Sequence, residues 1–433
     1  MMITMIRLYT CQVYNADHYD KTYDITKKLL RWTCIRITKD DKKSSVYYDL
    51  FLWFEFINLI IFGPSEFLGM ITTALAAESL EDYNKVLRMI PCCGSTILSL
   101  FKSTTIVYHR SVYENLIDEL RGMWPRGVVS EGEHKIIHTS LKQINFVVKG
   151  YFWCNNLLLV SFLAPPFFMT ISRYMGYDAP MGLQFIYWLP FNPFQPVYYE
   201  IMLLLQTWQG KSTIVIWWHV AWDMLFCTFI CHITTQFDLL ALRINRLCVI
   251  EEDYHQAGNY GKYIDKAIVH HADLSEQFWE IKLQKELAEI VLRHRALIRL
   301  SKDVESLCSL TLLANFINGS ITICFCGFCC ILVEKWNEFA YKSFLLTTLA
   351  QTWLLCWYGQ KLIDSSLAIS EAIYNCGWYN TSRKIKNYVL IILHRAQKSV
   401  HVTTYGFSVV SLASFSTVSF ITTPIICFSI GRK

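Results

Sequence analysis

The sequence is poor in charged residues and lacks the motifs of the common enzyme classes. Only 17% of its 433 residues are charged and 53% are hydrophobic, whereas an ordinary soluble protein has about 25% charged residues. It contains no HExxH zinc motif, no phosphate-binding loop and no GxSxG nucleophile elbow. The formal charge of +5 is too small to indicate a nucleic-acid partner. We therefore expect a membrane protein surrounded by lipid, and neither an enzyme nor a nucleic-acid-binding protein.

A signal peptide and a regular cysteine pattern are also missing. The first 28 residues have no unbroken apolar core, so we expect the N-terminus to stay in the cytosol uncleaved. The 16 cysteines lie mostly within apolar stretches, as Cys324 and Cys326 do. A metal site there would need ionised thiolates within hydrocarbon, which is costly. We interpret these cysteines as small buried hydrophobes, and expect no metal and no cofactor.

Long apolar stretches predict transmembrane helices, each of which needs about 20 mostly apolar residues. Six stretches meet this requirement plainly: 46–77, 144–171, 197–235, 307–333, 339–363 and 403–430. A seventh, 86–108, carries Arg88 and Lys102, and crosses if these side chains reach the interface or face the protein interior. The sequence therefore predicts an all-α polytopic membrane protein with seven transmembrane helices.

Lysine and arginine predict the orientation of these helices, because cytosolic loops retain positive charge. Of the 40 such residues, thirty lie before residue 46 or in the three segments 109–143, 240–303 and 361–401. The alternate segments are nearly free of them, so we expect a cytosolic N-terminus and an external C-terminus. The expected organisation is a cytosolic segment (1–45), six transmembrane helices (46–363) with a cytosolic helical extension (about 240–305), a cytosolic anchor segment (364–402), and a last transmembrane helix with a short external tail (403–433).

Two of the helices are expected to extend beyond the membrane. The fourth apolar stretch, 197–235, runs for about 37 residues, or about 55 Å, which exceeds the hydrocarbon thickness. Residues 273–316 contain no glycine or proline and begin with a cap-like Asp273-x-x-Glu276, which predicts a cytosolic helix that continues into the fifth span. Its long apolar face must be covered by this chain or by another subunit.

Ordered elements near the C-terminus resemble those of insect odorant receptors. Glu371 is followed by YNCGWY from Tyr374, a basic cluster from Arg383, RAQK from Arg395, and TYGFSVVSLASF from Thr404. Weaker agreement covers Lys102, the proline-rich loop before the fourth span, and Asp223 with the HITTQFDLL that follows it. The chain departs from the family pattern at Ser399, at Tyr405 and at its end, ITTPIICFSIGRK, where the family commonly has a SYSYFTLLR-like sequence.

The resemblance implies an odorant-gated, nonselective cation channel in the cell membrane of olfactory neuron dendrites. Such receptors form hetero-tetramers with a shared co-receptor, mainly through cytosolic anchor helices. They bind small volatile odorants in the outer half of the helix bundle, and the last span lines the pore. Hydroxyl residues of that span, among them Ser411 and Thr422, could offer oxygens to hydrated cations in the pore or serve ordinary helix packing. The family pattern places the pore constriction near Phe428 and Ser429.

A pocket for volatile organic molecules should be apolar, aromatic and sparsely polar. The outer halves of spans two, three, four and six supply the candidates, although helix packing is the alternative role of each one. The candidates are Met89, Cys93, Thr96, Asn155, Leu159, Phe162, Tyr199, Met202, Gln206, Phe344, Thr348 and Gln351.

Two pairs of polar residues within the expected spans have competing interpretations. His219 and Asp223 lie four residues apart on one helix face, which suggests acid–base chemistry, but a structural role is favoured because Asp223 matches a family position without a catalytic function. Glu55 and Glu66 are carboxylates within the first span, where an ionisable residue commonly marks a functional site. Solvation near the end of the span is the alternative for both.

Other receptor and transporter classes fit less well. A G-protein-coupled receptor predicts an external N-terminus and DRY and NPxxY motifs, which are missing here. A gustatory receptor of the same superfamily is the closer alternative, but its TYhhhhhQF-like ending is not found; Thr404-Tyr405 stands at the start of the last span instead. A secondary transporter predicts an internal repeat, and none is evident.

Overall fold

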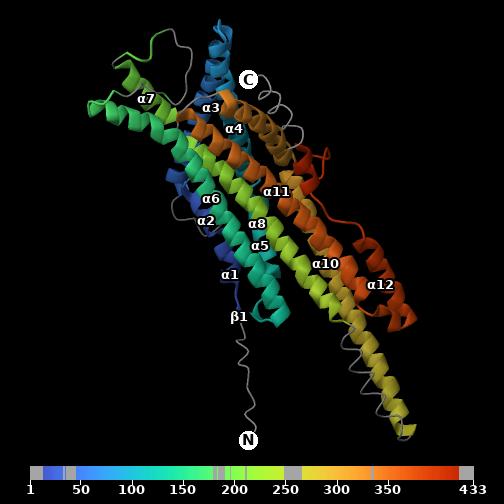
Figure 1. Cartoon of the computed structure of the whole chain (residues 1–433). Coiled ribbons are helices and arrows are strands. Elements are labelled where there is room, and N and C mark those ends of the chain that lie inside the picture. Colours follow the sequence, from blue (N-terminus) through green and yellow to red (C-terminus); the bar gives the residue numbers. More distant parts are fainter. Residues whose placement is uncertain are drawn as a thin grey trace, which may run out of the picture.

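The chain folds as a bundle of long helices in a computed structural model (Figure 1). The structure describes residues 13–32, 35, 45–178, 183, 191–195, 197–209, 212–247, 266–332 and 336–418. Its elements are β1 (Val13–Tyr14), α1 (Ala16–Asp20), η1 (Lys21–Tyr23), α2 (Asp24–Trp32), α3 (Ser45–Leu75), α4 (Leu80–Tyr108), α5 (Arg110–Met123), β2 (Gly127–Val128), α6 (Glu131–Tyr174), α7 (Tyr198–Gln209), α8 (Ser212–Asn245), α10 (Lys266–Leu332), α11 (Trp336–Asn375), η3 (Trp378–Asn380) and α12 (Arg383–Ala396). The two short strands pair antiparallel.

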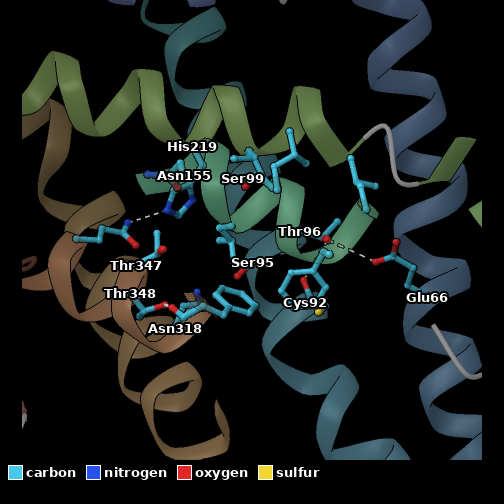
Figure 2. Close-up of a pocket in the computed structure, with 17 residues that line it drawn as sticks. Glu66, Cys92, Ser95, Thr96, Ser99, Asn155, His219, Asn318, Thr347 and Thr348 are labelled. Carbon is cyan, nitrogen blue, oxygen red and sulfur yellow. Dashed lines mark hydrogen bonds between the residues drawn. The ribbon is translucent and has the colours of Figure 1, made fainter. Parts of the chain in front are cut away.

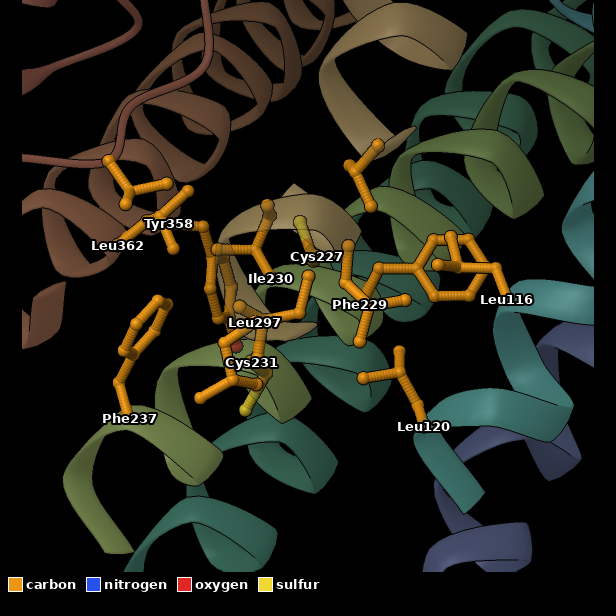
Figure 3. Close-up of a cluster of buried hydrophobic side chains, with 14 of the residues drawn as sticks. Leu116, Leu120, Cys227, Phe229, Ile230, Cys231, Phe237, Leu297, Tyr358 and Leu362 are labelled. Atoms are coloured by element: carbon orange, nitrogen blue, oxygen red, sulfur yellow. The ribbon is translucent and has the colours of Figure 1, made fainter. Parts of the chain in front are cut away.

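Helix α8 is the centre of the bundle. It packs against α4, α6, α10 and α11. In its most apolar 18-residue stretch, 83% of the residues are buried inside the protein, against 22% in the corresponding stretch of α6. Figure 3 shows its side chains Phe229, Ile230 and Cys231 among residues of α5, α10 and α11. A helix that is apolar on all sides must be covered on all sides, which explains this position.

The predicted all-α membrane architecture is confirmed. Four described helical stretches are long and apolar enough to cross a membrane: Met89–Tyr108, Glu131–Tyr174, Ile216–Asn245 and Trp279–Gly327. Helices α3 and α11 occupy the positions of two further expected spans. Of the expected last span, residues 403–411 are not helical, residues 412–418 begin the last helix, and residues 419–430 lie outside the described residues.

One local expectation was wrong. The cap expected at Asp273 is not a helix start, because α10 already begins at Lys266. The expected continuity is nevertheless found: α10 runs for 67 residues without a break, or about 100 Å at 1.5 Å per residue. Within the stretch 197–235 the structure describes α7 and α8, and residues 210 and 211 between them lie outside the described residues, so the expectation of one long helix stays a prediction.

The short N-terminal helices are fastened to the bundle by buried polar contacts. The hydroxyl of Tyr19 donates a hydrogen bond of 2.9 Å to the carbonyl oxygen of Ile117 on α5. The hydroxyl of Thr22 lies 2.9 Å from Nε2 of His232 on α8. Burial raises the pKa of the Tyr19 hydroxyl, which therefore stays protonated as a donor.

The segment that leads into the last helix is attached to α10 and α11. Thr403 donates two hydrogen bonds to the carboxylate of Glu305, from its backbone N–H (3.2 Å) and its hydroxyl (2.6 Å). The backbone N–H of Val400 donates to Ser366 on α11 (3.0 Å). At Gly359 of α11 the backbone of Val410 comes so close that a Cβ atom would overlap the carbonyl oxygen and lie 2.9 Å from the carbonyl carbon.

The substitution Gly359→Ala should therefore destabilise the protein, because a methyl group has no space unless the backbone at Val410 moves. Overpacking of this kind costs about 1–3 kcal/mol. The measurement is the thermal denaturation midpoint of the detergent-purified protein. The matched control is Gly150→Ala on α6, where no atom lies within 4 Å of a Cβ and the helix should gain about 0.5–1 kcal/mol. Equal midpoints for the two variants would contradict the close approach at Gly359.

Candidate ligand cavity and the polar network beside it

A cavity of about 110 Å³ lies between α3, α4, α6, α8, α10 and α11 (Figure 2). Its wall combines aliphatic and aromatic side chains with hydroxyl and amide groups, a carboxyl group and an imidazole. The lining residues are Glu66, Cys92, Ser95, Thr96, Ser99, Asn155, Leu158, Leu159, Phe162, Leu163, Ile216, His219, Asn318, Phe344, Thr347, Thr348 and Gln351. The mixture suits a small organic molecule with one polar group.

The polar part of the α4 wall follows from helical spacing. Four small residues are spaced three, one and three positions apart, which places them in one stripe along the helix: Cys92, Ser95, Thr96 and Ser99. Figure 2 shows this stripe facing the cavity. Small side chains here leave the space that the cavity occupies.

A buried carboxylate beside the cavity joins four helices, and one of its partners adds a fifth. The ammonium group of Lys102 (α4) donates to Oδ1 of Asp223 (α8) at 2.8 Å. The hydroxyl of Tyr151 (α6) donates to Oδ2 at 2.8 Å, and the amide nitrogen of Gln351 (α11) donates to the same oxygen at 3.0 Å. That amide nitrogen also lies 2.9 Å from the side-chain oxygen of Asn315 (α10).

The ion pair within this network is fully enclosed. The side chain of Lys102 is 0% exposed and that of Asp223 is 1% exposed. The third contact of the ammonium, besides Asp223 and His219, is the face of the Trp222 ring, with Nζ 5.1 Å from the ring centroid. An ammonium group has three N–H donors, and all three are therefore directed at a partner.

The contacts of His219 define its tautomer. Its Nε2 lies 2.7 Å from the amide nitrogen of Gln351 and 3.3 Å from the ammonium of Lys102. The ammonium can only donate, whereas the two hydrogens of the Gln351 amide nitrogen are shared among His219, Asp223 and Asn315. Nε2 must accept, so the ring is neutral and carries its proton on Nδ1. The ring is held by its contacts with Lys102 and Gln351, which fits the structural role favoured for His219 and Asp223.

The structure brings seven of the twelve candidate ligand residues around the cavity. They are Thr96, Asn155, Leu159, Phe162, Phe344, Thr348 and Gln351. Met89 and Cys93 are buried on α4 but do not line it; Cys93 is turned by about 100° from Cys92 around the helix. Tyr199, Met202 and Gln206 lie on α7, whose residues do not line the cavity.

Sequence reasoning did not select several lining residues. Glu66 stood out only as a carboxylate within a span, and His219 only as a partner of Asp223. The serines of the α4 stripe carried a signal in their helical spacing, which went unused. Of the four expected pore residues, Ser411 is largely buried next to Ser414, whereas Thr422, Phe428 and Ser429 lie outside the described residues.

Known proteins resemble this chain over most of its length. The family model described as 7tm Odorant receptor matches residues 82–422. Odorant receptor 67c of Drosophila melanogaster is 23% identical over 386 residues, which is 86% of this chain and 85% of that protein. The odorant receptor coreceptor of Ooceraea biroi is 31% identical over 128 residues, or 29% of this chain and 27% of that protein.

The fold is also that of a solved olfactory receptor. The structure of OR5 from Machilis hrabei in complex with eugenol matches with a TM-score of 0.77 at 14% identity, covering 97% of this chain and 100% of that one. The fold and cavity thus define a polytopic membrane receptor. Because the family model covers most of the sequence, the chain belongs to the insect odorant receptor family. It is an odorant receptor that acts as a ligand-gated channel and is not an enzyme.

Breaking the Lys102–Asp223 pair should destabilise the fold. Removing one partner of a buried ion pair leaves the other charge uncompensated, which costs about 3–5 kcal/mol. We expect Lys102→Met and Asp223→Asn each to lower the melting temperature in detergent, and the double variant to melt well above the value that the two single losses predict together.

The control for this cycle is the pair Arg121–Asp20, whose side chains are 45% and 28% exposed. The corresponding changes Arg121→Met and Asp20→Asn should cost no more than about 1 kcal/mol, because water screens the interaction. Strictly additive losses at Lys102 and Asp223 would refute the assignment of this ion pair as the link between α4 and α8.

Proposed function

We propose that the cavity is the odorant site and that its occupation opens a cation channel formed with a co-receptor. The observation that carries this proposal is Gln351, which both lines the cavity and donates a hydrogen bond to Asp223. A ligand that displaces this side chain alters contacts with α8 and α10 at the same time. Ligand binding is thereby connected to the helix packing of the whole bundle.

The size of the cavity limits the odorant. A buried apolar cavity of about 150 Å³ is sufficient for benzene, and the cavity here measures about 110 Å³. In proportion, compact volatiles with about four or five non-hydrogen atoms fit without rearrangement of the wall. Larger odorants require movement of Phe162 or Phe344, which face each other edge to face with ring centroids 5.9 Å apart.

The route to the channel gate runs along α11. Gln351 and Gly359 stand on this helix two turns apart, and Gly359 touches the backbone of Val410 at the entrance to the last helix. A displacement of α11 at the cavity is transmitted by direct contact to that segment. We place the pore in the last span by the family resemblance.

Assembly with a co-receptor would cover apolar surface that this chain leaves exposed. On α12, Tyr388, Leu390 and Ile391 are 44%, 47% and 69% exposed. These residues belong to the expected cytosolic anchor, together with the part of α10 before the membrane. We assign the N-terminus to the cytosol and the receptor to the dendritic membrane of olfactory neurons.

The cavity assignment predicts a change in size selectivity. Phe344→Ala should enlarge the cavity. The odorants that act at the lowest half-maximal concentration should then be ones with several more heavy atoms than those preferred by the unmodified protein. Small odorants should lose about 1–3 kcal/mol of binding free energy. The readout is the concentration–response curve of odorant-evoked currents. The matched control is Phe146→Ala on α6, a side chain that is 78% exposed and should leave size selectivity unchanged.

The proposed channel function is tested by expressing the chain with and without an insect co-receptor and recording currents to a panel of odorants. We expect odorant-dependent currents only in the combined expression. Currents that need neither the co-receptor nor an odorant would contradict the proposal.

A further inference from the structure

A second carboxyl group, Glu66 of α3, is part of the cavity wall and is not used by the network around Asp223. Its residue is only 7% exposed, so the alternative of solvation near a span end does not hold for it. Figure 2 shows the carboxyl group directed from α3 toward Thr96 on α4. It faces the cavity from the side opposite to Asn318 of α10 and Thr347 and Thr348 of α11.

The hydrogen bonding of this carboxyl group is weak. The hydroxyl of Thr96 lies 3.4 Å from Oε2 of Glu66, but it also lies 3.1 Å from the carbonyl oxygen of Cys92. A hydroxyl has one proton and can fully satisfy only one of these acceptors. The shorter contact is the one within α4, which leaves the carboxyl group poorly compensated.

Within the described part of the chain, no cationic side chain pairs with Glu66. Lys102 is the cation of the neighbouring network, and its three donors are occupied by Asp223, His219 and Trp222. His219 also lines the cavity, but its contacts make it neutral. A carboxylate buried without a countercharge is strongly disfavoured in a nonpolar environment.

Resting on the assignment of the cavity as the odorant site, we propose that Glu66 pairs with the protonated amino group of a small organic amine. An ammonium group supplies the missing charge and three donors, one for the carboxylate and others for acceptors such as the hydroxyl oxygens of Ser95 and Thr96. The hydrocarbon part of the amine packs against Leu159, Phe162 and Phe344. An alcohol of equal length supplies a donor without the charge, and an alkane supplies neither.

The test compares butylamine, 1-butanol and pentane, which have the same number of heavy atoms and fit the cavity volume. Apparent dissociation constants are measured from ligand-induced thermal stabilisation of the purified full-length protein in lipid nanodiscs. We expect Glu66→Gln to weaken butylamine by about 10- to 100-fold, the range of a charged hydrogen bond, and to change 1-butanol by less than about threefold. Glu66→Asp keeps the charge and should retain most of the amine affinity.

The matched control is Glu200→Gln, the same chemical change at a residue of α7 that bonds the Tyr174 hydroxyl on the surface. It should leave the affinity for butylamine unaltered. A measurement without any variant is the pH dependence of binding to the unmodified protein: butylamine affinity should fall as pH rises through the pKa of the ammonium group, while that of 1-butanol stays constant. This keeps the test decisive even if Glu66→Gln does not fold.

The outcomes separate this proposal from the proposed function. Two results overturn the role of Glu66 even when other odorants evoke currents. One is equal affinity of Glu66→Gln and the unmodified protein for butylamine, and the other is binding of 1-butanol without binding of butylamine. If butylamine binding depends on Glu66 but no odorant opens a channel in co-expression with the co-receptor, the amine site is supported and the channel assignment is overturned.

Discussion

The arrangement of the bundle depends on the buried ion pair between Lys102 and Asp223. Two opposite charges without water are stable only when every donor and acceptor has a partner, because the loss of hydration is large. Asp223 meets this requirement with groups from α4, α6 and α11, and Lys102 meets it with His219 and the Trp222 ring. The helices can therefore adopt few relative positions. A small rotation of any one of them would leave a charge or a polar group unpaired.

The network also determines the composition of the cavity beside it. Gln351 and His219 are held by Asp223 and Lys102, and the surfaces that they leave free form part of the wall. Asp223 is neutralised by the chain itself, whereas Glu66 is not. Of the two buried carboxyl groups, the first is satisfied without a ligand, and the second obtains a complete set of partners only when the cavity is filled.

Much of the fold follows from the sequence, because hydrophobic length and charge distribution are local properties. The positions of α3, α4, α6 and α11 and the continuity of α10 could be read from them. The cavity was harder to predict, since its wall depends on helix rotation: Cys93 was selected where Cys92 lines the space. The link between Lys102 and Asp223 joins residues 121 positions apart, and nothing in the local pattern of either helix indicates the other.

The attachment of the segment before the last helix limits how a ligand can act on the channel. Thr403 is bonded to Glu305 of α10, Val400 to Ser366 of α11, and Val410 lies against Gly359. With three contacts to two helices, this segment must follow α10 and α11 as they move. Both helices also reach the cavity, through Asn318 and Gln351. If a ligand shifts α10 relative to α11, the start of the last helix therefore moves with them. Packed helices exchange between discrete arrangements rather than deform continuously, so a small shift at the cavity is sufficient.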